Sequence, residues 1–114
     1  MKAKIYFRGV ENVEGLANIV KELLTKSGQV KASLKSEFIE AEYFRPEDLS
    51  KVVENLDVVC AEVELENVTI DRLVRIMLAL KSFEAIHYDN DRTLTIFCGN
   101  KDELVSVLKT LSSL

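Results

Sequence analysis

The chain has 114 residues, of which 47% are hydrophobic and 30% charged, and its formal net charge is −4. This composition excludes a disordered or fibrous chain and predicts a single domain, residues 1–114, that buries roughly two thirds of its unfolded surface. The acidic balance disfavours a general nucleic-acid binder, because such proteins neutralise phosphates with lysine and arginine. The apolar runs are short and interrupted by charge, so no membrane span is expected.

The two cysteines, Cys60 and Cys98, lie in apolar, strand-like runs. The first residues, MKAKIYFRGV, contain neither an apolar leader region nor a cleavage site. We therefore expect a reduced, cytoplasmic protein. The abundance of lysine and glutamate, with one proline and no tryptophan, is typical of thermophile proteins.

The first half of the chain begins with a strand and a helix. Residues 3–8 alternate apolar and polar side chains, which predicts a strand with one buried face. Apolar residues at helical spacing predict a helix over residues 13–24, with Asn12 as its N-cap and Gly28 as its stop.

A hairpin and a second helix complete this half. Two alternating runs, residues 30–35 and 38–44, predict the hairpin strands. Pro46 suits the first turn of the following helix, whose apolar stripe extends to Leu56. The second half repeats this order, with a strand, a helix, two hairpin strands and a final helix expected over residues 58–65, 70–83, 84–89, 92–98 and 101–114.

A short motif also recurs between the halves, since Glu11-Asn12-Val13 returns 55 residues later as Glu66-Asn67-Val68. The same offset superposes nine identities between residues 5–59 and 60–114, where about four are expected by chance. With the shared order of elements, this predicts a tandem βαββα repeat at about residues 1–56 and 57–114. Each asparagine is interpreted as ending a strand and capping or approaching the next helix, with Thr69 competing for the second cap.

The expected architecture follows from handedness. A strand, a right-handed crossover and a returning hairpin form the split βαβ arrangement of ferredoxin-like units. Two such units joined edge to edge predict an α+β fold, with a six-stranded antiparallel sheet ordered 2-3-1-4-6-5 and four helices on one face. The other face would be open, with side chains that include Lys4, Tyr6, Arg8, Lys31, Lys35, Glu40, Glu42, Glu62, Glu64, His87, Thr93, Thr95 and Phe97.

No motif in the sequence indicates catalysis. His87 is the only histidine, and a zinc site at Cys60 and Cys98 would need two carboxylates in addition. The glycines are isolated, so no glycine-rich phosphate loop is present. We therefore expect no catalytic residue, no cofactor and no metal.

The predicted helix over residues 70–83 carries more apolar side chains than one face can hold. A core stripe needs Ile70, Leu73, Val74, Met77 and Leu80. The surplus would be covered either by the last helix or by a partner, with arginines at its rim. The candidate partner-binding residues are Arg72, Arg75, Ile76 and Ala79.

The βαββα unit, and particularly the stretches RTLTIFCGNKDELVSVLKTL and FIEAEYFRPEDLSKVVENL, resembles the small dimerising subunit of the KEOPS tRNA-modification complex. In that family a strand of alternating residues leads through an acidic turn into a leucine-rich final helix. The resemblance implies that this chain is a fused pair of such subunits. The arginine and asparagine-serine pattern of that family's last helix is replaced here, by Lys51, Asn55, Ser106 and Thr110, and no functional residue is carried over.

These features favour a non-catalytic protein–protein interaction module, an accessory or scaffold subunit of a larger assembly or a homo-oligomer. One alternative is RNA or DNA binding by the open sheet. The glutamates that face the lysines of this sheet are interpreted as their partners in a cross-strand ladder. Another is a small-molecule-binding regulatory domain. The candidate nucleic-acid-binding residues are Lys4, Tyr6, Arg8, Lys31, Lys35 and Phe97.

Overall fold

The computed structural model describes residues 1–7, 22, 31–35, 38–42, 45–54, 56–80 and 85–114, with the backbone alone for residues 31–35. The strands are β1 (Lys2–Phe7), β2 (Lys31–Lys35), β3 (Phe38–Glu42), β4 (Val58–Leu65), β5 (Ile86–Tyr88) and β6 (Leu94–Cys98). The described helices are α2 (Pro46–Val53), α3 (Ile70–Ala79) and α4 (Lys101–Ser113).

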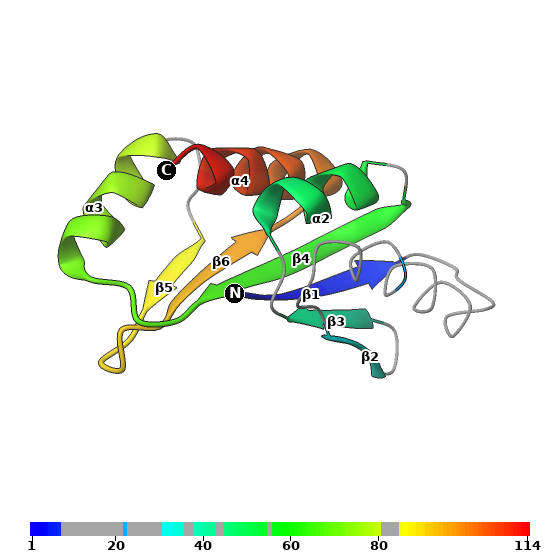
Figure 1. The fold of residues 1–114 in the computed structure, drawn as a ribbon, viewed down its shortest axis with the longest axis horizontal. Helices are drawn as coiled ribbons and strands as arrows, with labels where there is room; N and C mark the ends of the chain where they lie inside the picture. Colours follow the sequence, from blue (N-terminus) through cyan, green and yellow to red (C-terminus); the bar gives the residue numbers. More distant parts are fainter. Residues whose placement is uncertain (8–21, 23–30, 36–37, 43–44, 55, 81–84) are drawn as a thin grey trace.

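The strands form one antiparallel sheet in the order β2-β3-β1-β4-β6-β5, which is the strand order expected from the sequence (Figure 1). β1 and β4 meet at its centre, where Ala3 lies across from Val63. The matching elements on the two sides of this junction begin 55 or 56 residues apart, at Lys2 and Val58, Lys31 and Ile86, Phe38 and Leu94, and Pro46 and Lys101. Duplication of an ancestral unit stays a prediction.

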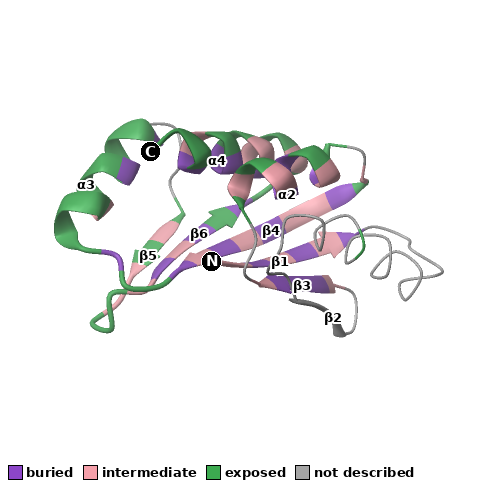
Figure 2. Ribbon diagram, in the orientation of Figure 1, coloured by how far each residue is buried: buried purple, intermediate pink, exposed green. Residues whose placement is uncertain are grey.

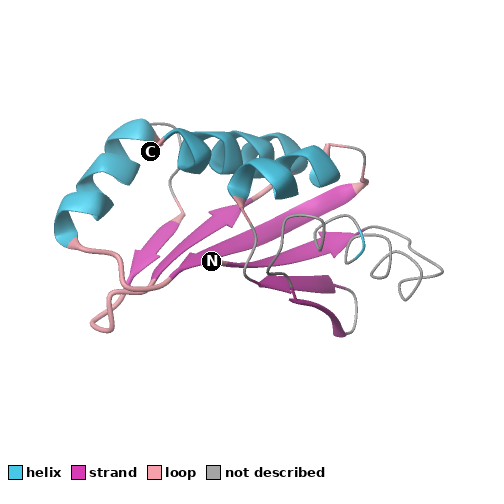
Figure 3. Cartoon of the chain, in the orientation of Figure 1, coloured by secondary structure: helices cyan, strands magenta, loops and turns pink. Residues whose placement is uncertain are grey.

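One face of the sheet carries the core. The alternation in β1 buries Ala3, Ile5 and Phe7 and leaves the residues between them partly exposed. Figure 2 shows the same alternation of buried and partly exposed positions along β4. α2 and α4 pack against each other over this face and contribute buried aliphatic residues such as Leu49 and Leu108 (Figure 3).

The helices begin where local sequence satisfies their first amide groups. The Asn100 side chain accepts a hydrogen bond from the Glu103 amide at 2.9 Å, and the Glu103 carboxylate accepts one from the Gly99 amide at 2.7 Å, a reciprocal cap at the start of α4. α2 lacks a side-chain cap bond at Arg45 and begins with Pro46, whose missing amide proton needs no partner there.

The predicted class, α+β, is confirmed, but the predicted architecture needs correction in its helices. The described residues hold three helices instead of four, because the helix expected over residues 13–24 lies outside them apart from Glu22. α3 ends at Ala79 instead of residue 83, since Leu80 leaves helical geometry with a ψ of 47° and is buried. β5 covers three residues of the expected 84–89, because its pairing with β6 extends only from Ile86 to Tyr88.

The second asparagine of the recurring motif ends β4 without capping α3. Asn67 has a φ of 56°, in the left-handed region that asparagine tolerates better than most residues. The cap is Thr69, whose hydroxyl accepts a hydrogen bond from the Arg72 amide at 3.3 Å. Asn12 lies outside the described residues.

Candidate functional site

The apolar residues of α3 form two separate faces. Ile76 is fully buried, Leu80 is 2% exposed, and Leu73 is packed partly against the core. Four other large apolar residues remain open to solvent, with exposed fractions of 71% for Ile70, 48% for Val74, 51% for Met77 and 63% for Leu78. Their spacing of four, three and one residues places these four on one face of the helix. We call this face the α3 stripe.

The stripe accounts for most of the large apolar surface among the described residues. Beyond its four members, only Phe97 on β6 and Leu114 at the chain's last position are exposed large hydrophobic residues in that part of the chain. Single exposed apolar residues are ordinary on a protein surface, whereas contiguous ones mark interaction sites. The stripe is therefore the strongest candidate for a functional surface.

The prediction for this helix is correct at Leu73 and Leu80, which face the core, and wrong at four other positions. Ile76, predicted to bind a partner, is a core residue, while the predicted core residues Ile70, Val74 and Met77 are exposed. The helix is rotated so that positions 73, 76 and 80 face the protein interior, a spacing as helical as that of the stripe. Spacing gave no signal for the buried face, because Leu73, Ile76 and Leu80 and the stripe residues satisfy helical spacing equally well.

The charged residues of α3 lie at different distances from the stripe. Asp71 and Arg75 follow Ile70 and Val74 by one residue each, so helix geometry places both along one flank of the stripe. Arg72 and Ala79, two of the predicted partner-binding residues, are exposed on the reverse side of the helix. Of the four predicted residues, only Arg75 borders the stripe.

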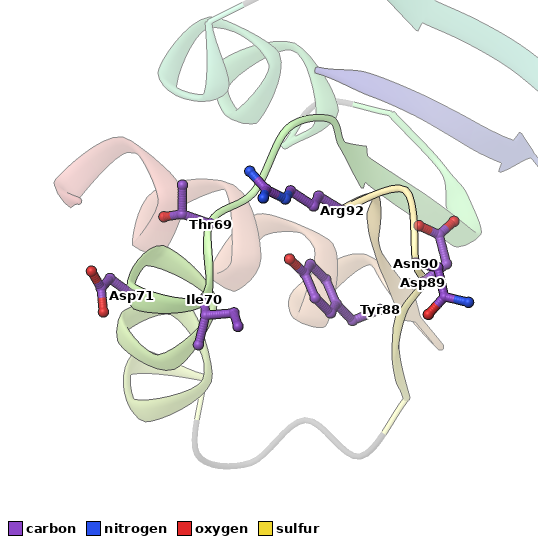
Figure 4. Close-up of a pocket in the computed structure, with 7 residues that line it drawn as sticks. All are labelled: Thr69, Ile70, Asp71, Tyr88, Asp89, Asn90 and Arg92. Carbon is purple, nitrogen blue, oxygen red and sulfur yellow. The ribbon is translucent and has the colours of Figure 1, made fainter.

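A hollow of about 520 Å³ lies between the start of α3 and the β5–β6 turn (Figure 4). Tyr88 donates a hydrogen bond from its hydroxyl to the Val68 carbonyl at 2.5 Å, and the Val68 amide donates one to the Arg92 carbonyl at 2.9 Å. The turn is itself fixed, because the Asp89 carboxylate accepts bonds from the amides of residues 91 and 93. These contacts hold the first turn of α3 against the sheet and so set the orientation of the stripe.

The open face of the sheet brings lysines next to glutamates. Lys4 lies directly across from Glu40 on β3 and from Glu62 on β4, and its ammonium is 6.0 Å from the centre of the Phe38 ring. The Lys2 ammonium lies 3.5 Å from Glu40 and 3.6 Å from Glu42. The hydrogen bond to Glu40, supported by neighbouring carboxylates, raises the pKa of Lys2 above its usual value. Lys2 is therefore already ion-paired, and Lys4 lies in register with two glutamates.

The aromatic residues of this face do not form a continuous stacking platform. The rings of Tyr6 and Phe38 contact each other with centroids 5.0 Å apart, and burial followed by the charge of Glu62 raises the pKa of Tyr6. Phe97 is 41% exposed but lies across from Glu62, with β4 between it and β1. Among the other predicted nucleic-acid-binding residues, Lys31 and Lys35 are placed by their backbone in β2, and Arg8 lies outside the described residues.

The two cysteines are free and belong to opposite faces of the sheet. Cys98 is buried on the core side and pairs in register with Ala61, so the neighbouring Cys60 points to the open face. Burial raises the pKa of the Cys98 thiol to about 12, which keeps it protonated and unreactive at neutral pH. Across the described ranges, no three histidine, cysteine, aspartate or glutamate residues come together as a metal site.

No helix in the described part of the chain combines the length and apolar character that a bilayer span requires. No protein-family model matches the chain, and no curated protein matches it.

Proposed function

We propose that this chain is a non-catalytic protein–protein interaction module that binds its partner through the α3 stripe. The observation that carries the proposal is the concentration of four large, exposed apolar side chains on one face of one helix. An amphipathic helix face of this kind is a recurrent protein-recognition surface, read at spacings of three, four and seven residues.

The size of the stripe sets the strength of the contact it can support. The four exposed fractions together amount to a little more than two whole side chains. Covering them would contribute about 3–7 kcal/mol, since full burial of one such side chain is worth about 1.5–3 kcal/mol. Association costs about 4–15 kcal/mol, so burial of the stripe alone does not give stable binding, and the partner must make further favourable contacts. Apolar surface on the partner and contacts with the charged flank would supply this remainder.

The role fits an accessory subunit better than a nucleic-acid binder. Lys2 is ion-paired with two glutamates and Lys4 lies in register with Glu40 and Glu62, so phosphate groups would have to compete with those carboxylates. The hollow at the start of α3 is open, and the side chains of Tyr88 and Asp89 that line it bond to the protein itself. The α3 stripe is the surface left without a partner inside the described part of the molecule.

The test is affinity purification of the tagged chain from its native host, with and without nuclease treatment, with two variants of equal added charge. Val74→Lys with Leu78→Lys places two lysines in the stripe, and Ala79→Lys with Phe97→Lys places them outside it. We expect a protein to copurify in stoichiometric amount with the wild type and the second variant and to be lost with the first. This protein is either a different one or an untagged copy of this chain. KEOPS components among the recovered proteins would support the fused-pair resemblance.

Two outcomes would contradict the proposal. One is recovery of the same proteins with the stripe variant. The other is recovery of nuclease-sensitive material alone, which would favour nucleic-acid binding by the open sheet.

A further inference from the structure

We propose that the partner covering the α3 stripe is a second copy of this chain, with the two α3 helices antiparallel about a two-fold axis near Val74. The inference rests on the proposed function, because it names the occupant of the same surface. The two halves of one chain already meet at β1 and β4, so the contact between copies would be a separate one.

In this arrangement the charged flank of one stripe is complementary to the same flank of the other copy. A two-fold axis perpendicular to antiparallel helices brings each flank against the same flank of the other copy. Asp71 and Arg75 lie on one flank, four residues apart, and in the described part of the chain neither is part of an ion pair. With the axis near Val74, Asp71 of each copy lies about 3 Å along the helix from the position directly opposite Arg75 of the other, an offset that the arginine side chain spans, so two ion pairs can form at the rim of the contact. Parallel helices would instead bring this flank against the opposite flank of the other copy, where the described residue next to the stripe is the apolar Leu73, and neither charge would be paired.

The same axis matches the apolar residues. Ile70 and Leu78 lie one helical turn before and after Val74, so each comes opposite the other across the axis, and the two Val74 side chains meet at the centre. Each stripe is then the cover of the other stripe. Such an isologous contact closes after two copies, and neither stripe stays open for further growth.

The extent of the stripe predicts a weak dimer. α3 has ten residues and is about 15 Å long, and stable complexes bury about 800 Å² on each partner, more than one short helix face provides. We expect a dissociation constant between roughly 10 µM and 1 mM. Below this dissociation constant the chain would be mainly monomeric, and above it mainly dimeric.

Sedimentation velocity with charge-reversed variants tests the arrangement directly. Wild type, Asp71→Arg, Arg75→Asp and the double variant are compared from about 5 µM to 1 mM, the range that brackets the expected dissociation constant. Each single variant places like charges in both rim pairs and should dimerise about tenfold more weakly. An equimolar mixture of the two single variants restores both pairs and should dimerise at least as well as wild type, as should the double variant. Thermal melting of each variant controls for folding, since both residues are exposed.

The outcomes separate this inference from the proposed function. A wild-type chain that stays monomeric up to about 1 mM overturns the second-copy inference. If a different protein then copurifies in a stripe-dependent way, the interaction module stands with another occupant. A dimer that resists Val74→Lys with Leu78→Lys, or a mixture that fails to recover, overturns the antiparallel α3 contact. Recovery in the mixture and loss with the stripe variant support it.

Discussion

Truncation of Ile76 to alanine should destabilise the protein far more than truncation of its neighbours on α3. Ile76 is fully buried, so Ile76→Ala removes three carbon atoms from the core, worth about 2.4 kcal/mol at ~0.8 kcal/mol each. The cavity left behind adds about 1 kcal/mol, for a total of about 3–4 kcal/mol. For a domain of this size, this lowers the melting temperature by about 12–16 °C.

The matched control is Val74→Ala in the α3 stripe. Val74 is 48% exposed, and the better helix propensity of alanine offsets about 0.5 kcal/mol of the lost burial, so the net change should stay below about 1 kcal/mol. Both variants are measured by thermal and urea denaturation at a concentration where the chain is monomeric. Equal destabilisation by the two variants would refute the reasoning, because it would mean that the stripe is part of the core.

Two further predictions concern polar groups. Tyr88→Phe removes the hydroxyl that bonds to the Val68 carbonyl and should cost about 1 kcal/mol in urea denaturation, while an unchanged midpoint would show that this bond does not hold α3. The pKa of Cys98 is raised to about 12 in the folded state, so the unfolded chain loses this proton at lower pH and stability should fall as pH rises from about 9 towards 12. Cys98→Ala should make this fall shallower, and an identical pH profile for the variant would contradict the assignment.

The strands could be predicted from the sequence because their period is unambiguous. The alternation of Ala3, Ile5 and Phe7 with polar neighbours fits one burial pattern, and a right-handed crossover leaves one order for the following strands. The first turn of α2 was predicted for a similar reason, since Pro46 has few other roles.

The orientation of α3 could not be predicted because two faces of this helix are apolar. Residues 73, 76 and 80 and residues 70, 74 and 77 both satisfy helical spacing, and local sequence does not decide between them. The decision comes from distant contacts, the packing of α3 against α4 and the bond between Tyr88 and Val68, which is 20 residues away in the chain. The candidate surface was therefore placed on the correct helix but on the wrong residues.

The most direct test of the α3 stripe uses the two methionines of the chain, Met1 and Met77. Met77 is in the stripe and 51% exposed, whereas Met1 packs partly against the core and is an internal reference. With ¹³C-labelled methionine methyl groups, NMR spectra should show the Met77 signal moving or broadening as concentration rises, or as a copurified partner is added, while the Met1 signal stays in place. If binding occurs and the Met77 signal does not change, the α3 stripe is not the interaction surface.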